Sequence, residues 1–265
     1  MKVAVVGTGL IGGSIGKGLL ESGLAESVFG FDLDAETLQC ALDGDFISEK
    51  LDVAEQGPEI DLWVLAVPPN AVSGWLQEIA SVARPEASIT DCTSVKQSLY
   101  SSLPESLTTQ FVGGHPMAGH RSHGLEYARA DLFEDAFWIL TPESSNSESL
   151  KKVEQMVYAL DAKPICMSPA EHDQHVAMLS HLPNMLANLL SGLGRDLQHE
   201  YVAGGSWQDL TRVAGGNPDL WKQILLHNRD DVVKALGELR NRLDAVEEAM
   251  KVGDEDALAR WFSGQ

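Results

Sequence analysis

Residues 2–12 of the chain read KVAVVGTGLIG, an apolar run that leads into three glycines at the spacing Gly-x-Gly-x-x-Gly. The run is long enough for a buried strand, and Ile11, Ile15 and Leu19 then recur at helical spacing until Gly23. A strand, a glycine turn and a helix in this order are typical of a dinucleotide-binding βαβ unit. A tight turn in another kind of α/β protein is the alternative interpretation.

The residues of this turn suit the binding of a pyrophosphate. Gly7 allows the tight turn, Gly9 lets a phosphate approach the backbone, and Gly12 lets the helix pack closely on the strand. Backbone N–H groups and the positive end of the helix dipole then face the phosphates. The other residues of the turn that we expect at the cofactor are Thr8, Leu10 and Ile11.

Asp32 ends the second predicted strand, at 28–31, and follows Gly12 by about twenty residues. A carboxylate at this place accepts hydrogen bonds from the adenosine ribose diol and repels a 2′-phosphate. No arginine or lysine lies between Asp32 and Lys50 to attract that phosphate. The sequence therefore predicts NAD rather than NADP, and the alternative is that Asp32 is merely a loop carboxylate beside Asp34.

Composition bounds the class of protein. A chain of 265 residues suits two domains, and a net charge of -20 disfavours binding to nucleic acid or anionic lipid. The three cysteines include no CxxC motif, and no stretch reaches the roughly 18 apolar residues that a membrane span needs. We therefore expect a cytoplasmic protein with reduced thiols that acts on a small molecule, without nucleic acid or membrane as a partner.

Predicted strands and helices alternate as far as Ser168. Further strands are expected at 61–67, 87–91, 111–112, 136–140 and 164–167, with helices at 71–83 and 147–160. This alternation predicts an α/β fold with a Rossmann-type, doubly wound and mostly parallel sheet. The third strand runs into Pro68, which places Val67 and Pro68 at the carboxyl edge of the sheet, where dinucleotides lie.

No convincing strand follows Ser168. The sequence predicts a helix from Ser168 to about Leu193 with a kink at Pro183, a short helix to Ala214, and a long helix from Pro218. That last helix carries a heptad-like apolar stripe, typical of a helical core or of a subunit interface: Val232, Leu236, Leu239, Leu243, Val246 and Met250. We therefore predict a dinucleotide-binding domain at 1–168 and an all-helical domain at 169–265 that forms a homodimer.

Three segments carry side chains that suit hydride-transfer chemistry, at 91–96, 114–119 and 180–184. The first two follow strands and should share the carboxyl edge of the sheet, whereas the third should come from across a cleft. An imidazole such as that of His115 has an ordinary pKa of about 6.5 and can accept a proton near neutral pH. From the residues alone, a loop histidine and a helix-capping serine are the alternatives for His115 and Ser94.

In combination, these motifs resemble the prephenate/arogenate dehydrogenase family of tyrosine biosynthesis. The resemblance spans nearly the whole chain and is carried by the glycine motif and by residues 90–96, 115–119, 132–142, 171–174, 180–183 and 209–218. It implies NAD-dependent oxidative decarboxylation of prephenate to 4-hydroxyphenylpyruvate. In that reaction a hydride leaves C4, the 4-hydroxyl proton passes to a base, and CO2 leaves as the ring becomes aromatic.

The resemblance also implies roles for single residues. His115 matches the family's catalytic histidine, and Ser94 matches a serine that orients this imidazole near the nicotinamide. Arg212 matches an arginine that binds a substrate carboxylate, for which a guanidinium is well suited. Ser180 and His181 match positions near the substrate. A surface salt bridge with Asp209 is the alternative for Arg212, and a satisfied core histidine is the alternative for His181.

Three further positions that we expect at the substrate depart from the family pattern. Asn184 replaces a histidine of some members, Gln208 replaces a lysine or arginine, and Arg121 stands where others have an acidic residue or a histidine. Less positive charge favours the amino-acid side chain of arogenate, but Arg121 can restore what Gln208 removes. We expect prephenate as the substrate because it is the commoner substrate in the family that the chain resembles, with an arogenate-specific or dual-specificity cyclohexadienyl dehydrogenase as the alternative.

A metal site is not expected. His115, His120 and His123 lie in one segment and His172 and His175 in another, but no carboxylate or thiolate falls at a matching spacing.

Two other functions compete with the dehydrogenase. A 3-hydroxyacid or imine reductase would use a lysine of the helical half, and Lys222 and Lys234 lack the expected glycine-rich context. A sensor that binds NAD without turnover is the third possibility.

Overall fold

The computed structural model describes residues 1–119, 124–195 and 202–263. The chain forms two compact units. The first consists of Met1–Asp173 together with Gly215–His227, and the second of Gln174–Ala214 together with Asn228–Gln265. The units interleave along the sequence, so the division of the chain at Ser168 into two domains stays a prediction.

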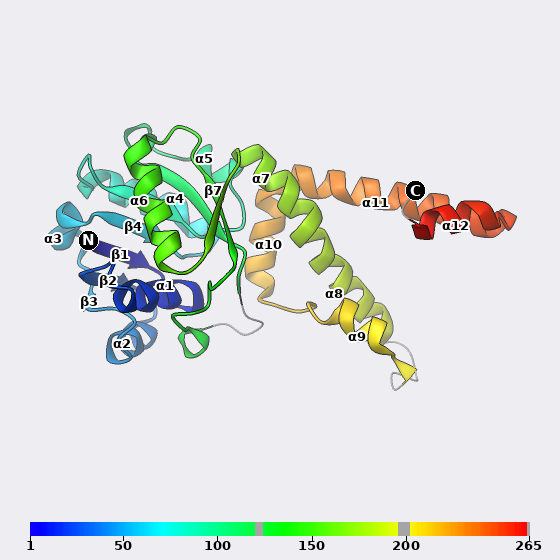
Figure 1. Cartoon of the computed structure of the whole chain (residues 1–265), viewed down its shortest axis with the longest axis horizontal. Helices are drawn as coiled ribbons and strands as arrows, with labels where there is room; N and C mark the ends of the chain where they lie inside the picture. Colours follow the sequence, from blue (N-terminus) through cyan, green and yellow to red (C-terminus); the bar gives the residue numbers. More distant parts are fainter. Residues whose placement is uncertain (120–123, 196–201, 264–265) are drawn as a thin grey trace. The chain divides into compact units, whose positions relative to one another are not determined.

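The first unit is built on an eight-stranded sheet with the order β3-β2-β1-β4-β5-β6-β7-β8 (Figure 1). Its strands are β1 (Lys2–Val6), β2 (Ser27–Phe31), β3 (Glu49–Lys50), β4 (Leu62–Leu65), β5 (Ser88–Asp91), β6 (Phe111–Pro116), β7 (Phe137–Thr141) and β8 (Lys163–Cys166). All neighbours pair in parallel except β6 and β7. The predicted doubly wound, mostly parallel sheet is therefore confirmed.

Helices cover both faces of this sheet because successive side chains of a strand point to opposite sides. Val3 and Val5 of β1 join the core under α1 (Leu10–Glu21), α2 (Ala35–Asp43) and α6 (Ser147–Ala159). Ala4 and Val6 join the core on the opposite face, under α4 (Pro69–Val82) and α5 (Gln97–Tyr100). Shorter helical segments are α3 (Val53–Gln56), η1 (Gly57–Glu59), η2 (Glu105–Leu107) and η3 (Leu125–Tyr127).

Two strands differ from the predicted ones. The predicted strand at 111–112 continues to Pro116, because the antiparallel partner β7 extends the ladder beyond the two residues that pair with β5. His115 therefore lies in a strand, opposite Ile139, rather than in a loop. The short strand β3 was not predicted, since its two residues are exposed and carry no apolar pattern.

The helical part of the chain begins with a capping box at the start of α7 (Pro169–Val176). The Ser168 N–H donates to Glu171 Oε2 at 2.8 Å, and the Glu171 N–H donates to Ser168 Oγ at 3.2 Å. A π-helical turn, η4 (Ala177–His181), separates α7 from α8 (Leu182–Arg195). Pro183 accounts for this turn, because proline cannot donate to a carbonyl of the preceding turn and its ring clashes there.

The predicted long helix from Pro218 is wrong, because the structure has three helices instead of one. They are α10 (Pro218–His227), α11 (Arg229–Val252) and α12 (Glu255–Ser263), and the short α9 (Gly205–Thr211) precedes them. Asn228 leaves the helical conformation between α10 and α11, and Gly253 is left-handed with φ +69°. Glycine adopts that conformation without steric cost and commonly ends a helix.

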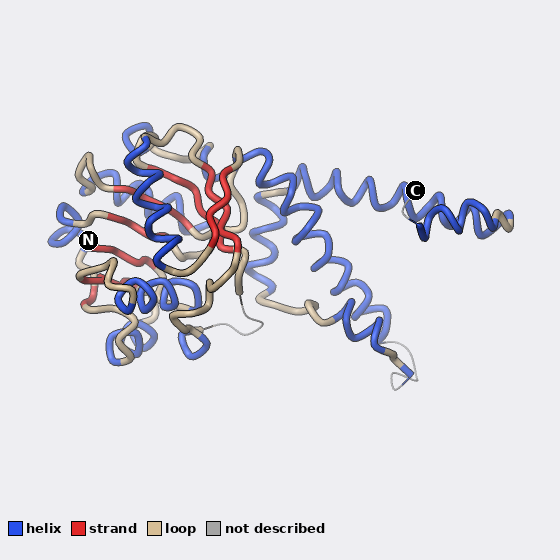
Figure 2. The backbone as a smooth tube through the Cα atoms, in the orientation of Figure 1, coloured by secondary structure: helices blue, strands red, loops and turns tan. Residues whose placement is uncertain are grey.

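Among the described residues no strand follows Cys166 (Figure 2). None of the helices described is both long enough and apolar enough to cross a lipid bilayer. The three cysteines, Cys40, Cys92 and Cys166, are free thiols.

Candidate active site

The glycine turn has the geometry that its sequence predicts. Gly7 has φ +90°, and a Cβ there would lie 2.5 Å from the carbonyl oxygen of Ala66. A Cβ on Gly12 would overlap the carbonyl oxygen of Gly7, so helix and turn are in close contact. A Cβ on Gly9 would instead meet no atom within 4 Å beyond its own chain neighbours, and α1 starts after it without a side-chain cap. The first N–H groups of α1 thus begin beside open space, as phosphate binding requires.

Asp32 is bonded to the same turn. Its Oδ2 accepts a hydrogen bond from the Thr8 N–H at 2.8 Å, and its Oδ1 accepts one from the Asp34 N–H at 3.0 Å. Asp34 has a different task, since its carboxylate caps α2 through the N–H groups of Glu36 and Thr37. Asp32 therefore connects the end of β2 to the glycine turn, where the Gly7 N–H also donates to the Phe31 carbonyl at 2.7 Å. The half-buried Asp32 carboxylate lies where a ribose diol would meet it.

A cavity of about 260 Å³ brings five of the predicted site residues together. They are Ile11 of α1, Val67 and Pro68 after β4, Ser94 after β5, and His115 of β6. The rest of the lining consists of Ala66, Pro69, Cys92, Thr93, Pro116 and Ala118, with Leu220 and Ile224 of α10.

Leu220 and Ile224 were not predicted at the site. They lie one helical turn apart on α10, more than a hundred residues after Ala118, the last of the other lining residues, and no motif marks them. Their apolar side chains give this cavity a wall that comes from late in the chain.

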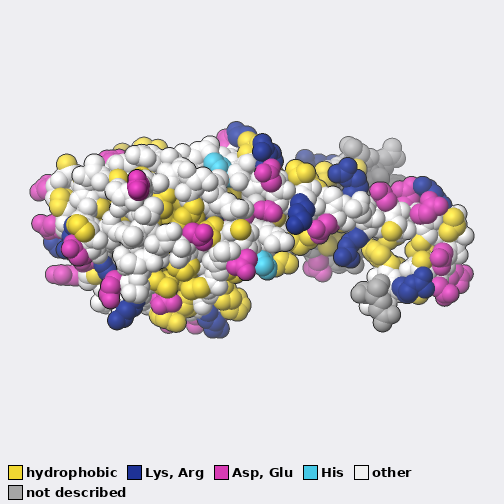
Figure 3. Space-filling view, turned by 90° about the horizontal axis from the view of Figure 1, so that it is seen from above, with side chains coloured by type: hydrophobic (Ala, Val, Ile, Leu, Met, Phe, Trp, Pro, Cys, Tyr) yellow, Lys and Arg dark blue, Asp and Glu magenta, His cyan; other side chains and the backbone are white. Residues whose placement is uncertain are grey.

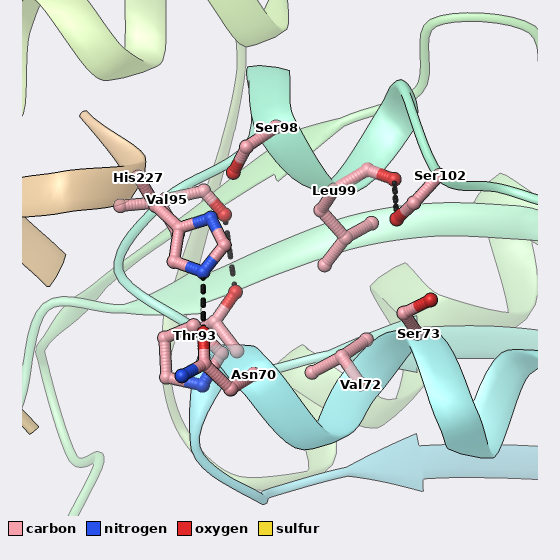
Figure 4. A pocket seen from close by; sticks show the side chains of 10 residues that line it. Asn70, Val72, Ser73, Thr93, Val95, Ser98, Leu99, Ser102 and His227 are labelled. Atoms are coloured by element: carbon pink, nitrogen blue, oxygen red, sulfur yellow. Dashed lines mark hydrogen bonds between the residues drawn. The ribbon is translucent and has the colours of Figure 1, made fainter. Parts of the chain in front are cut away.

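A second cavity, of about 250 Å³, shares Pro69 and Thr93 with the first (Figure 4). His227 projects over it and donates from Nε2 to Asn70 Oδ1 at 2.7 Å. The Asn70 N–H in turn donates to Gln223 Oε1 at 3.1 Å. The first turn of α4 thus holds α10 by two hydrogen bonds, and this attachment positions the wall formed by Leu220 and Ile224.

The segment that carries Ser94 is shaped by a buried ion pair. Lys96 Nζ donates to Asp91 Oδ2 at 2.6 Å and to the Thr93 carbonyl at 2.8 Å, and both charged side chains are fully buried. Asp91 Oδ1 also accepts from the Gly114 N–H at 3.0 Å, which ties β5 to the strand that carries His115. Burial raises the pKa of the neighbouring Cys92 thiol, so this sulfur is no thiolate near neutral pH.

His115 is buried and contacts a second histidine. Its Nδ1 lies 2.8 Å from His172 Nε2, and His172 Nδ1 lies 2.7 Å from Asp173 Oδ1. Two nitrogens bound to one tetrahedral zinc would lie about 3.3 Å apart, so the shorter distance indicates a direct hydrogen bond. His120, His123 and the predicted substrate residue Arg121 lie outside the described residues.

His172 and Asp173 were not predicted at the site, although residues 171–174 are part of the family resemblance. Burial lowers the pKa of His172, and the hydrogen bond to Asp173, which raises it, only partly compensates. Burial acts to raise the pKa of Asp173, but hydrogen bonds from His172 and from the Gln97 and Lys96 N–H groups outweigh it and lower the pKa. At neutral pH a neutral imidazole therefore faces a carboxylate.

The remaining predicted site residues lie in the second unit. Asn184 Nδ2 donates to the Val213 carbonyl at 2.9 Å, so α8 holds the residue that follows Arg212. Arg212 and Gln208 are exposed, and within the described part of the chain no carboxylate pairs with Arg212. The salt bridge with Asp209 that was the alternative for Arg212 is thus not formed.

The two residues expected near the substrate lie in the π-helical turn. Ser180 is half-buried. His181 is buried, and its Nδ1 accepts a hydrogen bond from Asn228 Nδ2 at 3.2 Å. A π-helical turn often marks a functional position, but the contacts of Ser180 and His181 with a substrate stay predictions.

Comparison with known families decides the identity. Residues 15–166 match the nucleotide-binding domain of prephenate dehydrogenase, and residues 168–264 match its dimerization domain. The chain belongs to the prephenate dehydrogenase family. The resemblance read from the sequence, and with it the expectation of a dehydrogenase, is therefore confirmed.

Individual members of the family are similar over almost the whole chain. Prephenate dehydrogenase of Bacillus subtilis is 32% identical over 98% of this chain and 73% of its own length. The structure of A. aeolicus prephenate dehydrogenase, solved with hydroxyphenyl propionate and NAD+, is 30% identical with a TM-score of 0.90, over 100% of this chain and 95% of that one. The structure of Synechocystis arogenate dehydrogenase is 28% identical with a TM-score of 0.86, over 100% and 97%.

Proposed function

We propose that the protein is an NAD-dependent dehydrogenase that converts prephenate to 4-hydroxyphenylpyruvate and CO2. The observation that carries this proposal is the cavity at the carboxyl edge of the sheet, in which His115 and Ser94 lie with residues of the glycine turn and of the β4–α4 segment. A base, a hydroxyl group and a dinucleotide-binding turn are thus gathered at one place. Membership of the family supplies the reaction class.

The residues present fit NAD as the cofactor. The glycine turn offers open backbone at Gly9 to a pyrophosphate, and Asp32 offers a carboxylate to the adenosine ribose. Val67, Pro68 and Ser94 line the cavity in which the nicotinamide would lie. NAD supplies the hydride acceptor of the reaction. The A. aeolicus relative was solved with NAD+, which supports the same choice here.

His115 acts as the base for the 4-hydroxyl group. As hydride leaves C4, the imidazole takes the hydroxyl proton and the C4–O bond becomes a carbonyl. Loss of CO2 then returns an electron pair through the ring to that oxygen, and the imidazolium gives the proton back. His115 therefore takes up one proton and returns it within the same reaction. Ser94 orients the imidazole by hydrogen bonding near the same oxygen.

Arg212 binds a carboxylate of the substrate, and its exposed guanidinium can do so with two parallel hydrogen bonds. Asn184 holds the Arg212 segment through the Val213 carbonyl and thus affects the same contact. With Asn184 and Gln208 uncharged, an arogenate or dual-specificity enzyme is the second candidate. The chain is similar to both a prephenate and an arogenate dehydrogenase, which supports testing both substrates.

The test is the initial rate of NADH formation with prephenate and with arogenate in parallel assays. Turnover of prephenate with the higher kcat/KM supports the proposal, and a higher value for arogenate selects the second candidate. His115→Ala is expected to lower kcat by roughly 10²–10⁴ while the NAD dissociation constant stays unchanged. Binding of NAD without turnover of either substrate would contradict the proposal and favour a reductase or a sensor.

The matched control for His115→Ala is His175→Ala, because His175 is an exposed histidine outside the cavity. Its kcat should equal that of the wild type.

We further propose that the enzyme is a cytoplasmic homodimer that pairs through its C-terminal helices. The match to a dimerization domain supports this pairing, and so do the exposed apolar side chains of the helices: Leu189 and Leu193 on α8, Leu243 and Met250 on α11, and Trp261 and Phe262 on α12. Three free thiols are consistent with a reducing compartment.

A further inference from the structure

Two buried residues behind His115 have no part in the function proposed above. His172 lies against His115, and the two rings are inclined at 61° with their centroids 5.1 Å apart. Asp173 bonds to the far side of His172. Neither His172 nor Asp173 has any exposed surface, so water does not compete for these hydrogen bonds.

His115, His172 and Asp173 form a hydrogen-bonded row, and the positions of its protons follow from the Asp173 carboxylate. An ionised carboxylate only accepts hydrogen bonds, so His172 must carry its proton on Nδ1, where it faces Asp173. The Nε2 of a neutral His172 is then an acceptor, and His115 must carry its proton on Nδ1 to donate to it. The lone pair of a neutral His115 is consequently on Nε2.

Asp173 also fixes the segment that carries Ser94. Its Oδ1 accepts from the Lys96 N–H and its Oδ2 from the Gln97 N–H, both at 2.8 Å. The same carboxylate therefore holds the base through His172 and the Ser94 segment through the backbone. These elements lie far apart in the sequence, and all of them belong to the first unit.

The charges around His172 favour a positive charge on the row. The groups that face it are Asp173 on its own helix, His115 on β6, Lys96 after β5, and Asp91 at the end of β5. With both histidines neutral, one lysine stands against two carboxylates, so this buried cluster has one negative charge in excess. An imidazolium that forms at His115 neutralises that excess.

We propose that His172 and Asp173 are positioning residues that hold His115 in its Nδ1–H tautomer, so that Nε2 is the atom that takes the substrate proton. This inference rests on the proposed role of His115 as the base. The O–H bond of the substrate breaks as the N–H bond at Nε2 forms, and the Nδ1 proton stays in its hydrogen bond to His172. The negative charge of Asp173 stabilises the imidazolium until the proton returns to the substrate oxygen.

Paired substitutions of His172 test the row. His172→Phe keeps a flat ring but removes the acceptor for His115, and we expect kcat to fall roughly 10–10³-fold with the NAD dissociation constant within about a factor of three. The acidic limb of the kcat/KM profile should move to lower pH, because His115 loses a group that stabilises its charged form. His172→Gln offers a carbonyl oxygen to the His115 Nδ1–H and should recover part of kcat.

The control pair is His175→Phe and His175→Gln, which make the same changes at an exposed histidine of the same helix and should leave kcat and its pH profile unchanged. If His172→Phe binds NAD and keeps kcat within a factor of two with an unshifted pH profile, the positioning role is wrong. A merely structural role would lower stability without this shift and without rescue by glutamine.

A spectroscopic measurement on the wild-type enzyme tests the proton order without relying on a variant that must fold around a changed core. Nitrogen NMR of ¹⁵N-histidine-labelled protein, with the His115 signal assigned by its loss in His115→Ala, should show protonated Nδ1 and unprotonated Nε2 above pH 7.5. Protonation at Nε2 would overturn the inference. Absence of turnover in the wild type would instead contradict the proposed function, so the two failures are distinguishable.

Discussion

Several of the largest side chains of the first unit are fully buried, whereas the aromatic side chains at the end of the second unit are exposed. Trp63, Trp138 and Phe133 have no accessible surface, but Trp261 is 46% and Phe262 is 81% exposed. Figure 3 shows yellow apolar side chains among the charged ones on the helices toward the right of the view. The nucleotide-binding unit thus holds its own core, whereas the helical unit leaves apolar faces that require another surface.

Charged groups differ in the same way. Lys96 and Asp91 form a fully buried pair in the first unit, but Lys251 and Glu247 form a largely exposed pair on α11. Burial removes water from a charge, so each buried partner depends on the other, whereas an exposed partner can return to solvent. This contrast can be tested by breaking one pair in each unit.

Lys96→Met should have the largest effect on stability, because it leaves Asp91 buried and uncompensated. We expect the free energy of unfolding to fall by about 3–5 kcal/mol, measured by urea denaturation at one fixed protein concentration. Lys251→Met is the control and should cost about 0.5 kcal/mol or less. Equal losses in the two variants would show that burial does not distinguish these pairs.

The exposed stripe of α11 predicts the next effect. Leu243 and Met250 are 53% and 67% exposed, and changing both to aspartate should weaken the proposed dimer at least about 10²-fold, since each buried apolar side chain contributes about 1.5–3 kcal/mol. Sedimentation velocity over a concentration series measures the dissociation constant. Tyr158→Asp, on a 62% exposed residue of the first unit, is the control. An unchanged dimer in the double variant would place the interface elsewhere.

Asp32→Ser should change cofactor choice without affecting the helical unit. Loss of the carboxylate is expected to raise the KM for NAD by roughly 10–100-fold and to relax discrimination against NADP, because hydrogen bonds to a charged group contribute about 1.5–3 kcal/mol. The ratio of kcat/KM for the two cofactors measures this selectivity. Asp34→Ser replaces one N-cap side chain of α2 by another and should leave the ratio unchanged. The same ratio in Asp32→Ser would show that the ribose is recognised elsewhere.

The smallest effect concerns pH. Burial lowers the pKa of His172 below its ordinary value of 6.5, so the unfolded chain binds a proton more readily there than the folded protein does. This contribution to stability is fully present above pH 6.5 and is lost as the pH falls below that value. Thermal midpoints at pH 7.5 and 5.5 should therefore differ less in His172→Gln than in the wild type. An equal difference would show that His172 is not the responsible group.

The fold could be predicted because its signals are local. The apolar run at 2–6 and the glycine turn determine a strand and a helix by their own spacing, and the alternation that follows determines the parallel sheet. The extent of β6 could not be predicted, because its last residues are held by β7, which the sequence places after a long loop. The break at Asn228 was hidden by an apolar stripe that continues on both sides of it.

The candidate site was predictable where each residue belongs to a motif next to a strand, as Ser94 and His115 do. His172 and Asp173 were missed because their partners lie 57 and 77 residues away, at His115 and Lys96. They come together because β7 pairs antiparallel with β6 and β8 pairs parallel with β7. The helix α7 that follows β8 then carries His172 and Asp173 to His115 of β6. Contacts of this kind depend on topology rather than on spacing along the chain.

The attachment of α10 to Asn70 has a consequence for how the protein is made. The helix at Pro218–His227 packs with the first unit, although α8 and α9 of the second unit precede it in the chain. During synthesis, the nucleotide-binding unit therefore cannot complete its fold until residue 227 has left the ribosome tunnel. A nascent chain that has emerged only to Ser168 has the whole sheet but not the Leu220 and Ile224 wall, and it exposes apolar surface that the finished protein covers.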